Sequence, residues 1–85
     1  MRAIGSPPRE RHHGRVLLSA HSEYRGVIWD RTGRGELWRD EAQHKDPEVA
    51  FRHMVTAADK IAASTGIDVD VYRFGRDVNP IRRAA

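Results

Sequence analysis

The sequence contains no cysteine. This absence excludes a disulfide scaffold, a cysteine-ligated zinc or iron–sulfur centre and a thiol nucleophile. The chain also lacks any apolar run near the roughly 18 residues that a membrane-spanning helix needs, so we expect no transmembrane segment. Residues 1–8 have no apolar core of the kind found in secretory signals, and we therefore expect a cytoplasmic protein.

Lysine is scarce, because thirteen of the fifteen basic residues are arginine, and the charge is uneven along the chain. Residues 1–15 hold four Arg and one Glu, residues 76–85 hold three Arg and one Asp, and residues 16–75 hold eight basic and ten acidic groups. We interpret residues 1–15 as a flexible basic N-terminal arm and residues 76–85 as a basic C-terminal tail. Residues 16–75 are then a single small domain.

The stretch from Asp46 to Gly66 is typical of one amphipathic helix with both ends marked. Asp46 is a favourable N-cap, and Pro47 follows at the first helical position, where its missing N–H has no cost. Gly66 is the residue type that usually adopts the left-handed conformation just beyond a helix. Between them, apolar residues recur at spacings of three and four, which predicts one buried helical stripe: Phe51, Met54, Val55, Ala58, Ile61 and Ala62.

Short strand patterns surround this helix. We predict strands over residues 16–20, 24–29, 36–39 and 67–74, the last from its alternation of apolar and polar residues. The fold class is therefore α+β, with the order β-β-β-α-β. We expect an antiparallel three-stranded meander with the helix on one face. The fourth strand would pair parallel to the first or the third strand.

The second hairpin decides which aromatic residues share a face. If residues 31–34 form its loop, Ile28 lies opposite Leu37 and Val27 lies opposite Trp38. One helix covers only one face, so Val27, Trp29 and Trp38 would then lie together on the uncovered face with Arg25 beside them. A register slip of one residue would instead divide the two tryptophans between the faces.

No arrangement of residues predicts an enzyme. Residues 21–23, His-Ser-Glu, are adjacent on a turn, whereas a catalytic triad requires groups that converge in space. His44 and His53 lie on either side of the helix start, and we interpret His53, with Asp59 or Lys60 on an exposed helical face, as solvated. Asp68 and Asp70 share a face of the last strand but lack a third ligand, so we predict no metal and no cofactor.

The first functional hypothesis is a small non-enzymatic module that binds a protein partner or forms a homodimer. It would use an open sheet edge or the uncovered face containing Arg25, Val27, Trp29 and Trp38, because Trp and Arg often anchor interfaces. Asp68 and Asp70 on that face would repel phosphates, which favours a protein partner. A core built from about 60 residues is small, and self-association would increase its buried area.

The alternative hypothesis is a nucleic-acid-associated accessory or regulatory protein. Basic arms on a neutral body are compatible with phosphate contacts. The contacts would come from the arginines of the two terminal segments: Arg2, Arg9, Arg11, Arg15, Arg82 and Arg83.

Overall fold

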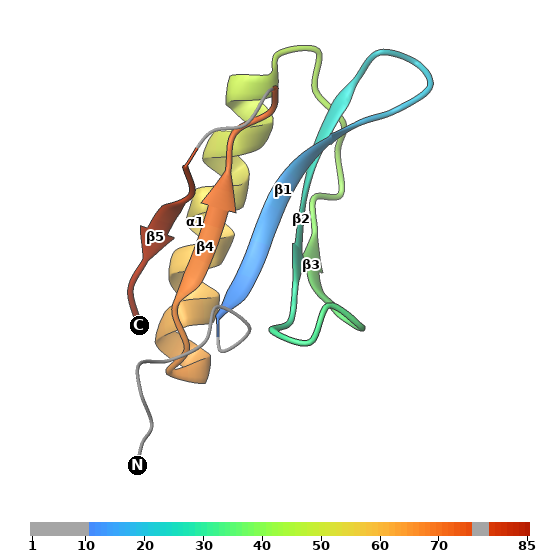
Figure 1. Ribbon diagram of the computed structural model, residues 1–85. Helices are drawn as coiled ribbons and strands as arrows, with labels where there is room; N and C mark the ends of the chain where they lie inside the picture. The colour runs from blue at the N-terminus through green and yellow to red at the C-terminus, as the bar shows by residue number, and fades with distance from the viewer. Residues whose placement is uncertain (1–10, 76–78) are drawn as a thin grey trace.

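The computed structural model describes residues 11–75 and 79–85, and these form a single α+β unit. Its elements in chain order are β1 (His12–Leu18), β2 (Tyr24–Trp29), β3 (Glu36–Arg39), α1 (Pro47–Thr65), β4 (Val69–Tyr72) and β5 (Ile81–Arg83). The five strands form one open sheet in the order β3-β2-β1-β4-β5, and α1 packs along one side of it (Figure 1). The predicted α+β class and the order of three strands, helix and strand are confirmed.

The helix forms where its capping residues predict it. Asp46 accepts a hydrogen bond of 2.9 Å from the backbone N–H of Glu48, and Pro47 is the first helical residue. Gly66 ends α1 with φ of +72°, and its N–H donates to the carbonyl of Ala62. The three terminal signals in the sequence are therefore all used as caps.

The sheet is mixed because the chain crosses over between β3 and β4. β1, β2 and β3 pair antiparallel in sequence order, as predicted. After α1 the chain returns to the other side of β1, where β4 pairs parallel to β1. β5 then pairs antiparallel with β4 and forms the far edge of the sheet.

The boundaries of the predicted terminal segments are corrected in two places. β1 begins at His12, so the expected boundary between arm and domain at residues 15 and 16 lies inside a strand. Burial alternates along this strand, and the positions at His12, Gly14 and Val16 are buried. Prediction missed it because two of these residues are not apolar. At the other end, Ile81–Arg83 forms β5, although the sequence analysis interpreted residues 76–85 as a tail.

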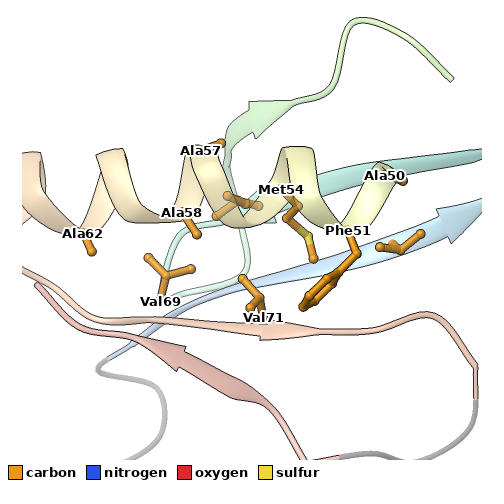
Figure 2. Packing of buried hydrophobic residues seen from close by; sticks show 10 residues of the cluster. Ala50, Phe51, Met54, Ala57, Ala58, Ala62, Val69 and Val71 are labelled. Carbon is orange, nitrogen blue, oxygen red and sulfur yellow. The ribbon is translucent and has the colours of Figure 1, made fainter. Parts of the chain in front are cut away.

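The core lies between α1 and the sheet. Figure 2 shows Phe51 and Met54 of α1 directed toward Val69 and Val71 of β4, with Ala58 beside them. Both valines and Met54 are fully buried. Small residues let the helix approach closely, since the buried stripe of α1 includes four alanines: Ala50, Ala57, Ala58 and Ala62.

The second hairpin contains a bulge that the sequence analysis did not predict. Trp29 lies opposite Glu36, in the register expected for a loop at residues 31–34, but Ile28 then lies opposite Trp38. Leu37 is thus an extra residue in β3, and beyond it the strand is displaced by one position. The arrangement with Trp38 beside Val27 and Trp29 is therefore wrong, because Trp38 lies on the helix side; the alternative, in which the two tryptophans are divided between the faces, is the one observed.

Candidate functional site

The face of the sheet that points away from α1, here called the open face, collects charged and aromatic side chains. Pairing partners in a sheet point to the same side, so the strand registers define its members. They are His13, Arg15 and Leu17 of β1; Arg25, Val27 and Trp29 of β2; Glu36 and Arg39 of β3; Asp70 and Tyr72 of β4; and Arg82 of β5. Arg11, just before β1, joins them through a contact with Asp70.

Two rows of side chains cross the open face. One row runs Arg82, Asp70, His13, Trp29 and Glu36 from β5 to β3. The next row runs from Tyr72 through Arg15 and Val27 to Arg39. The first row therefore places two rings between charged residues, and the second alternates arginines with aromatic or apolar groups.

Asp70 is neutralised by two arginines. Its Oδ2 accepts from Nε of Arg11 at 2.8 Å and its Oδ1 from Nε of Arg82 at 3.2 Å. The residue is only 6% exposed, and its hydrogen bond raises the pKa of Arg11. Asp68 accepts instead from the backbone N–H of Ala85 at 2.9 Å. The argument that these carboxylates repel phosphates is therefore weakened, since Asp70 positions cations on this face.

The aromatic rings of the open face are arranged for stacking. The rings of His13 and Trp29 lie 6.3 Å apart with an interplanar angle of 30°. The guanidinium carbon of Arg15 lies 4.0 Å from the centroid of the Tyr72 ring, a cation–π contact. Val27 lies opposite Arg15 and on the same strand as Trp29, and it is fully buried. Partly accessible rings thus flank a closed apolar centre.

A hollow of about 340 Å³ lies at the β1–β4 side of this face. It is lined mainly by basic and aromatic groups: Arg11, His12, His13, Arg15, Arg31, Asp70 and Tyr72. Three guanidinium groups around two imidazoles and one phenol ring form a setting suited to a planar ligand with negative charge.

The charge of the domain is concentrated on the open face. Five arginines (Arg11, Arg15, Arg25, Arg39 and Arg82) oppose two carboxylates, Glu36 and Asp70, which leaves a formal charge of +3. One of these cations is paired with Glu36, whose pKa is lowered by the hydrogen bond from Arg39. In contrast, α1 carries Glu48, Asp59, Arg52 and Lys60 and is neutral. The molecule therefore has one basic side.

The predicted site residues are brought together only in part. Arg25, Val27 and Trp29 share the open face as predicted, whereas Trp38 packs against the core on the other side. Of the arginines assigned to the terminal segments, Arg11, Arg15 and Arg82 lie on the open face. Arg83 points to the helix side and pairs with Asp59 at 2.7 Å, while Arg2 and Arg9 lie outside the described residues.

Besides Asp70, five residues of the open face were not predicted as site residues: His13, Leu17, Glu36, Arg39 and Tyr72. A signal was present for the first, because Arg11, His13 and Arg15 recur at a spacing of two, which is the period of a strand face. The interpretation of residues 1–15 as an arm concealed that alternation.

A second group of functional residue types lies away from the open face. Asp40, His44 and His53 bring one ligand atom each to within 4.8 Å of one another. His53 was interpreted as solvated, but it hydrogen-bonds to Asp40, as His44 also does. His53 lies 13 residues from Asp40 in sequence, and this separation gave no indication of the convergence.

Comparisons with protein-family models, with curated proteins and with solved structures returned no match for this chain. Within residues 11–75 and 79–85, α1 is the one helix, and it is not apolar enough to cross a membrane. The functional argument therefore depends on the geometry of the sites.

Proposed function

We propose that this chain is a small non-enzymatic module that binds single-stranded nucleic acid on the open face of its sheet. The observation that carries the proposal is the grouping of five arginines with Trp29, Tyr72 and His13 on one uncovered surface. Arginine-lined surfaces with interspersed aromatic rings suit single strands, because guanidinium groups follow phosphates while rings stack on bases.

Phosphate contacts would come from the arginines around the hollow. Arg15 is exposed, and Arg11 is held in place by Asp70, so its guanidinium keeps a fixed orientation. Arg82 reaches the same carboxylate from β5, which sets a second cation beside the first. A backbone that follows the row from β5 to β1 would pass these groups in turn. Cations held in place by a carboxylate lose less side-chain entropy on binding.

Base contacts would come from the rings. Trp29 is partly exposed beside His13, and the guanidinium of Arg15 already stacks on Tyr72. A base could extend the stack of Arg15 on Tyr72, since guanidinium planes and aromatic rings both accept stacked bases. The rings lie on the surface of a sheet, where the unpaired bases of a single strand reach them and the paired bases of a duplex do not. The proposal therefore favours a single strand over a duplex.

The first sequence hypothesis, a protein partner or homodimer, stays a prediction. Two of its supporting arguments are weakened. Trp38 packs against the core and is not on the proposed contact surface, and Asp70 is paired with Arg11, so it would repel phosphates less than expected. Two copies joined through their open faces would also bring like-charged arginines together. A homodimer would thus have to use the edges of the sheet at β3 or β5. A cytoplasmic location remains part of the proposal.

The proposal can be tested by fluorescence anisotropy with a short labelled single-stranded RNA, a DNA of the same sequence and the matching duplex. Arg15→Gln removes a cation from the open face, and Arg52→Gln is the matched control, since it removes the same charge from the exposed side of α1. We expect Arg15→Gln to weaken single-strand binding by roughly five- to tenfold and Arg52→Gln to leave it nearly unchanged.

Salt dependence provides a second readout. Each phosphate contact contributes about 0.7 to the slope of log affinity against log salt for a single strand, and Arg15→Gln should reduce the slope by about this amount. Tyr72→Leu should weaken binding without changing the slope, because it removes stacking and no charge. Equal losses in Arg15→Gln and Arg52→Gln, or tighter binding of the duplex, would contradict the proposal. Selective binding of an acidic protein in place of RNA and DNA would support the first sequence hypothesis instead.

A further inference from the structure

Asp40 and His44 of the connection after β3 converge with His53 of α1. Asp40 directly follows β3, and its backbone N–H donates to the carbonyl of Gly26 at 3.0 Å, which continues the ladder with β2. Alternation along β3 therefore turns Asp40 to the helix side, next to Trp38. His53 lies on the second turn of α1, above that position. The sheet and the helix thus hold two of the three groups.

His44 is fixed by its backbone. It forms an isolated bridge with Tyr24, in which the N–H of Tyr24 donates to His44 at 2.7 Å and the N–H of His44 donates in return at 2.8 Å. Its side chain is 16% exposed, so the ring is enclosed. The position of this ring is therefore set by pairing with β2, which also carries Arg25, Val27 and Trp29 of the open face.

One carboxylate oxygen is the meeting point of the cluster. Oδ2 of Asp40 lies 2.9 Å from Nε2 of His44 and 3.2 Å from Nδ1 of His53. The other oxygen, Oδ1, accepts from the backbone N–H of Ala42 at 3.1 Å, and this bond fixes the carboxylate plane. Such outer contacts orient metal ligands in proteins. Asp40 itself is buried.

These separations are close to those of a transition-metal site. In a tetrahedral zinc site with bonds of about 2.0–2.1 Å, ligand atoms are about 3.4 Å apart. The two oxygen-to-nitrogen separations of 2.9 and 3.2 Å are within about half an ångström of that value, and all three ligand atoms lie within 4.8 Å of one another. Two imidazoles and one carboxylate are a donor set that suits zinc and related divalent ions, and that Mg²⁺ and Ca²⁺ do not prefer.

The cluster also has a free direction. The side chain of His53 is 51% exposed, whereas those of Asp40 and His44 are 8% and 16% exposed, so the cluster reaches solvent on the side of His53. His53 further lines a hollow of about 500 Å³ beside Trp38, Ala57 and Ile61. A metal with three protein ligands would therefore keep one position for water or for a small ligand.

We propose that Asp40, His44 and His53 form a binding site for one divalent transition-metal ion of the zinc class, joining the segment after β3 to α1. The site lies on the helix side of the sheet and does not depend on nucleic-acid binding by the open face. Its metal would cross-link the connection between β3 and α1, which carries Asp40 and His44, to the second turn of α1.

The test uses the untagged full chain after treatment with a chelator. Zn²⁺ is titrated by calorimetry, and thermal unfolding is measured with Zn²⁺ or Mg²⁺. His53→Gln removes one ligand from an exposed position and should leave the fold intact. His21→Gln is the matched control on an exposed turn, and His13→Gln is a control for the histidines of β1. Co²⁺ serves as a spectroscopic probe of coordination geometry.

We expect the wild type, His21→Gln and His13→Gln to bind one equivalent of Zn²⁺, with a Tm raised by about 10 °C or more at a hundredfold excess of free metal over the Kd. His53→Gln should lose at least about tenfold in affinity, and the visible absorption of tetrahedral Co²⁺ should disappear with it. Unchanged affinity in His53→Gln, loss in His13→Gln, or an equal Tm shift with Mg²⁺ would each overturn the proposal.

Discussion

Replacing Gly26 with alanine should destabilise the domain more than the same change at Gly14, although both glycines lie beneath Met54. A Cβ at Gly26 would stand 2.8 Å from the Cβ of Met54 and 3.3 Å from the carbonyl oxygen of Ala50. Both of these atoms are fixed to the helix backbone. A Cβ at Gly14 would stand 2.9 Å from Sδ of Met54, the far end of a flexible side chain, 3.0 Å from Cγ1 of Ile28 and 3.3 Å from the backbone carbonyl oxygen of Val27.

The magnitudes follow from these contacts. Overpacking against fixed atoms costs about 1–3 kcal/mol, from which the lower entropy of the unfolded alanine chain recovers about 0.4–1 kcal/mol. We therefore expect Gly26→Ala to lower the free energy of unfolding by about 1–2 kcal/mol. Gly14→Ala should cost about 1 kcal/mol or less, because Sδ can move. Neither glycine has a positive φ, so backbone strain does not contribute.

A double-mutant cycle with Met54→Ala distinguishes the two contacts. That change costs about 2–5 kcal/mol by itself, and it removes Sδ while keeping Cβ. It should relieve the clash at Gly14, with a favourable coupling of about 1 kcal/mol, and leave the clash at Gly26 unrelieved. Urea denaturation followed by circular dichroism measures the free energy of unfolding of the wild type, the single variants and the two double variants. Equal coupling at both glycines would refute the proposed close approach of α1 to the sheet.

Three further predictions address the pH dependence, the helix cap and the open face. Burial lowers the pKa of His12, so as the pH falls the unfolded chain takes up the proton before the folded chain does. The free energy of unfolding should therefore be constant above about pH 7 and decrease below about pH 6.5. Urea denaturation at several pH values should show a smaller decrease in His12→Leu. An unchanged pH profile in His12→Leu would contradict this reasoning. Asp46→Ala removes the N-cap bond to α1 and should cost about 1 kcal/mol in the free energy of unfolding, whereas Asp46→Ser should cost less; equal losses would argue against a capping role. In a Trp38→Phe background the one remaining tryptophan is Trp29, and its fluorescence should be quenched on titration with single-stranded RNA; an unaltered signal at saturation would exclude stacking on that ring.

The helix and most of the sheet could be predicted because their signals are local. Asp46, Pro47 and Gly66 act within one turn of their own positions, and the spacing of Phe51 and Met54 reflects the period of the helix itself. The second and third strands were predicted with the observed bounds for the same reason. The strand at residues 67–74 was predicted too long, as β4 covers Val69–Tyr72.

The bulge in β3 was not predictable from the local pattern. Asp30 closes the hairpin loop by accepting from the backbone N–H of Thr32 at 2.9 Å, and Trp29 keeps the expected partner, Glu36. Beyond that pair, however, Trp38 moves to the helix side, where it packs against the core. Burial of the ring beside α1 favours this arrangement, and no residue of the hairpin indicates it alone.

The amino-acid order by itself determined the elements of this protein: a capped helix, three strands before it and one after it, since each is encoded by neighbouring residues. Tertiary structure decided how those elements combine. It paired β4 with β1, added β5, divided the tryptophans, and drew Arg11, Arg15 and Arg82 onto one surface and Asp40, His44 and His53 into one cluster. These outcomes depend on contacts between residues far apart in the chain, where no local periodicity determines which side chains meet.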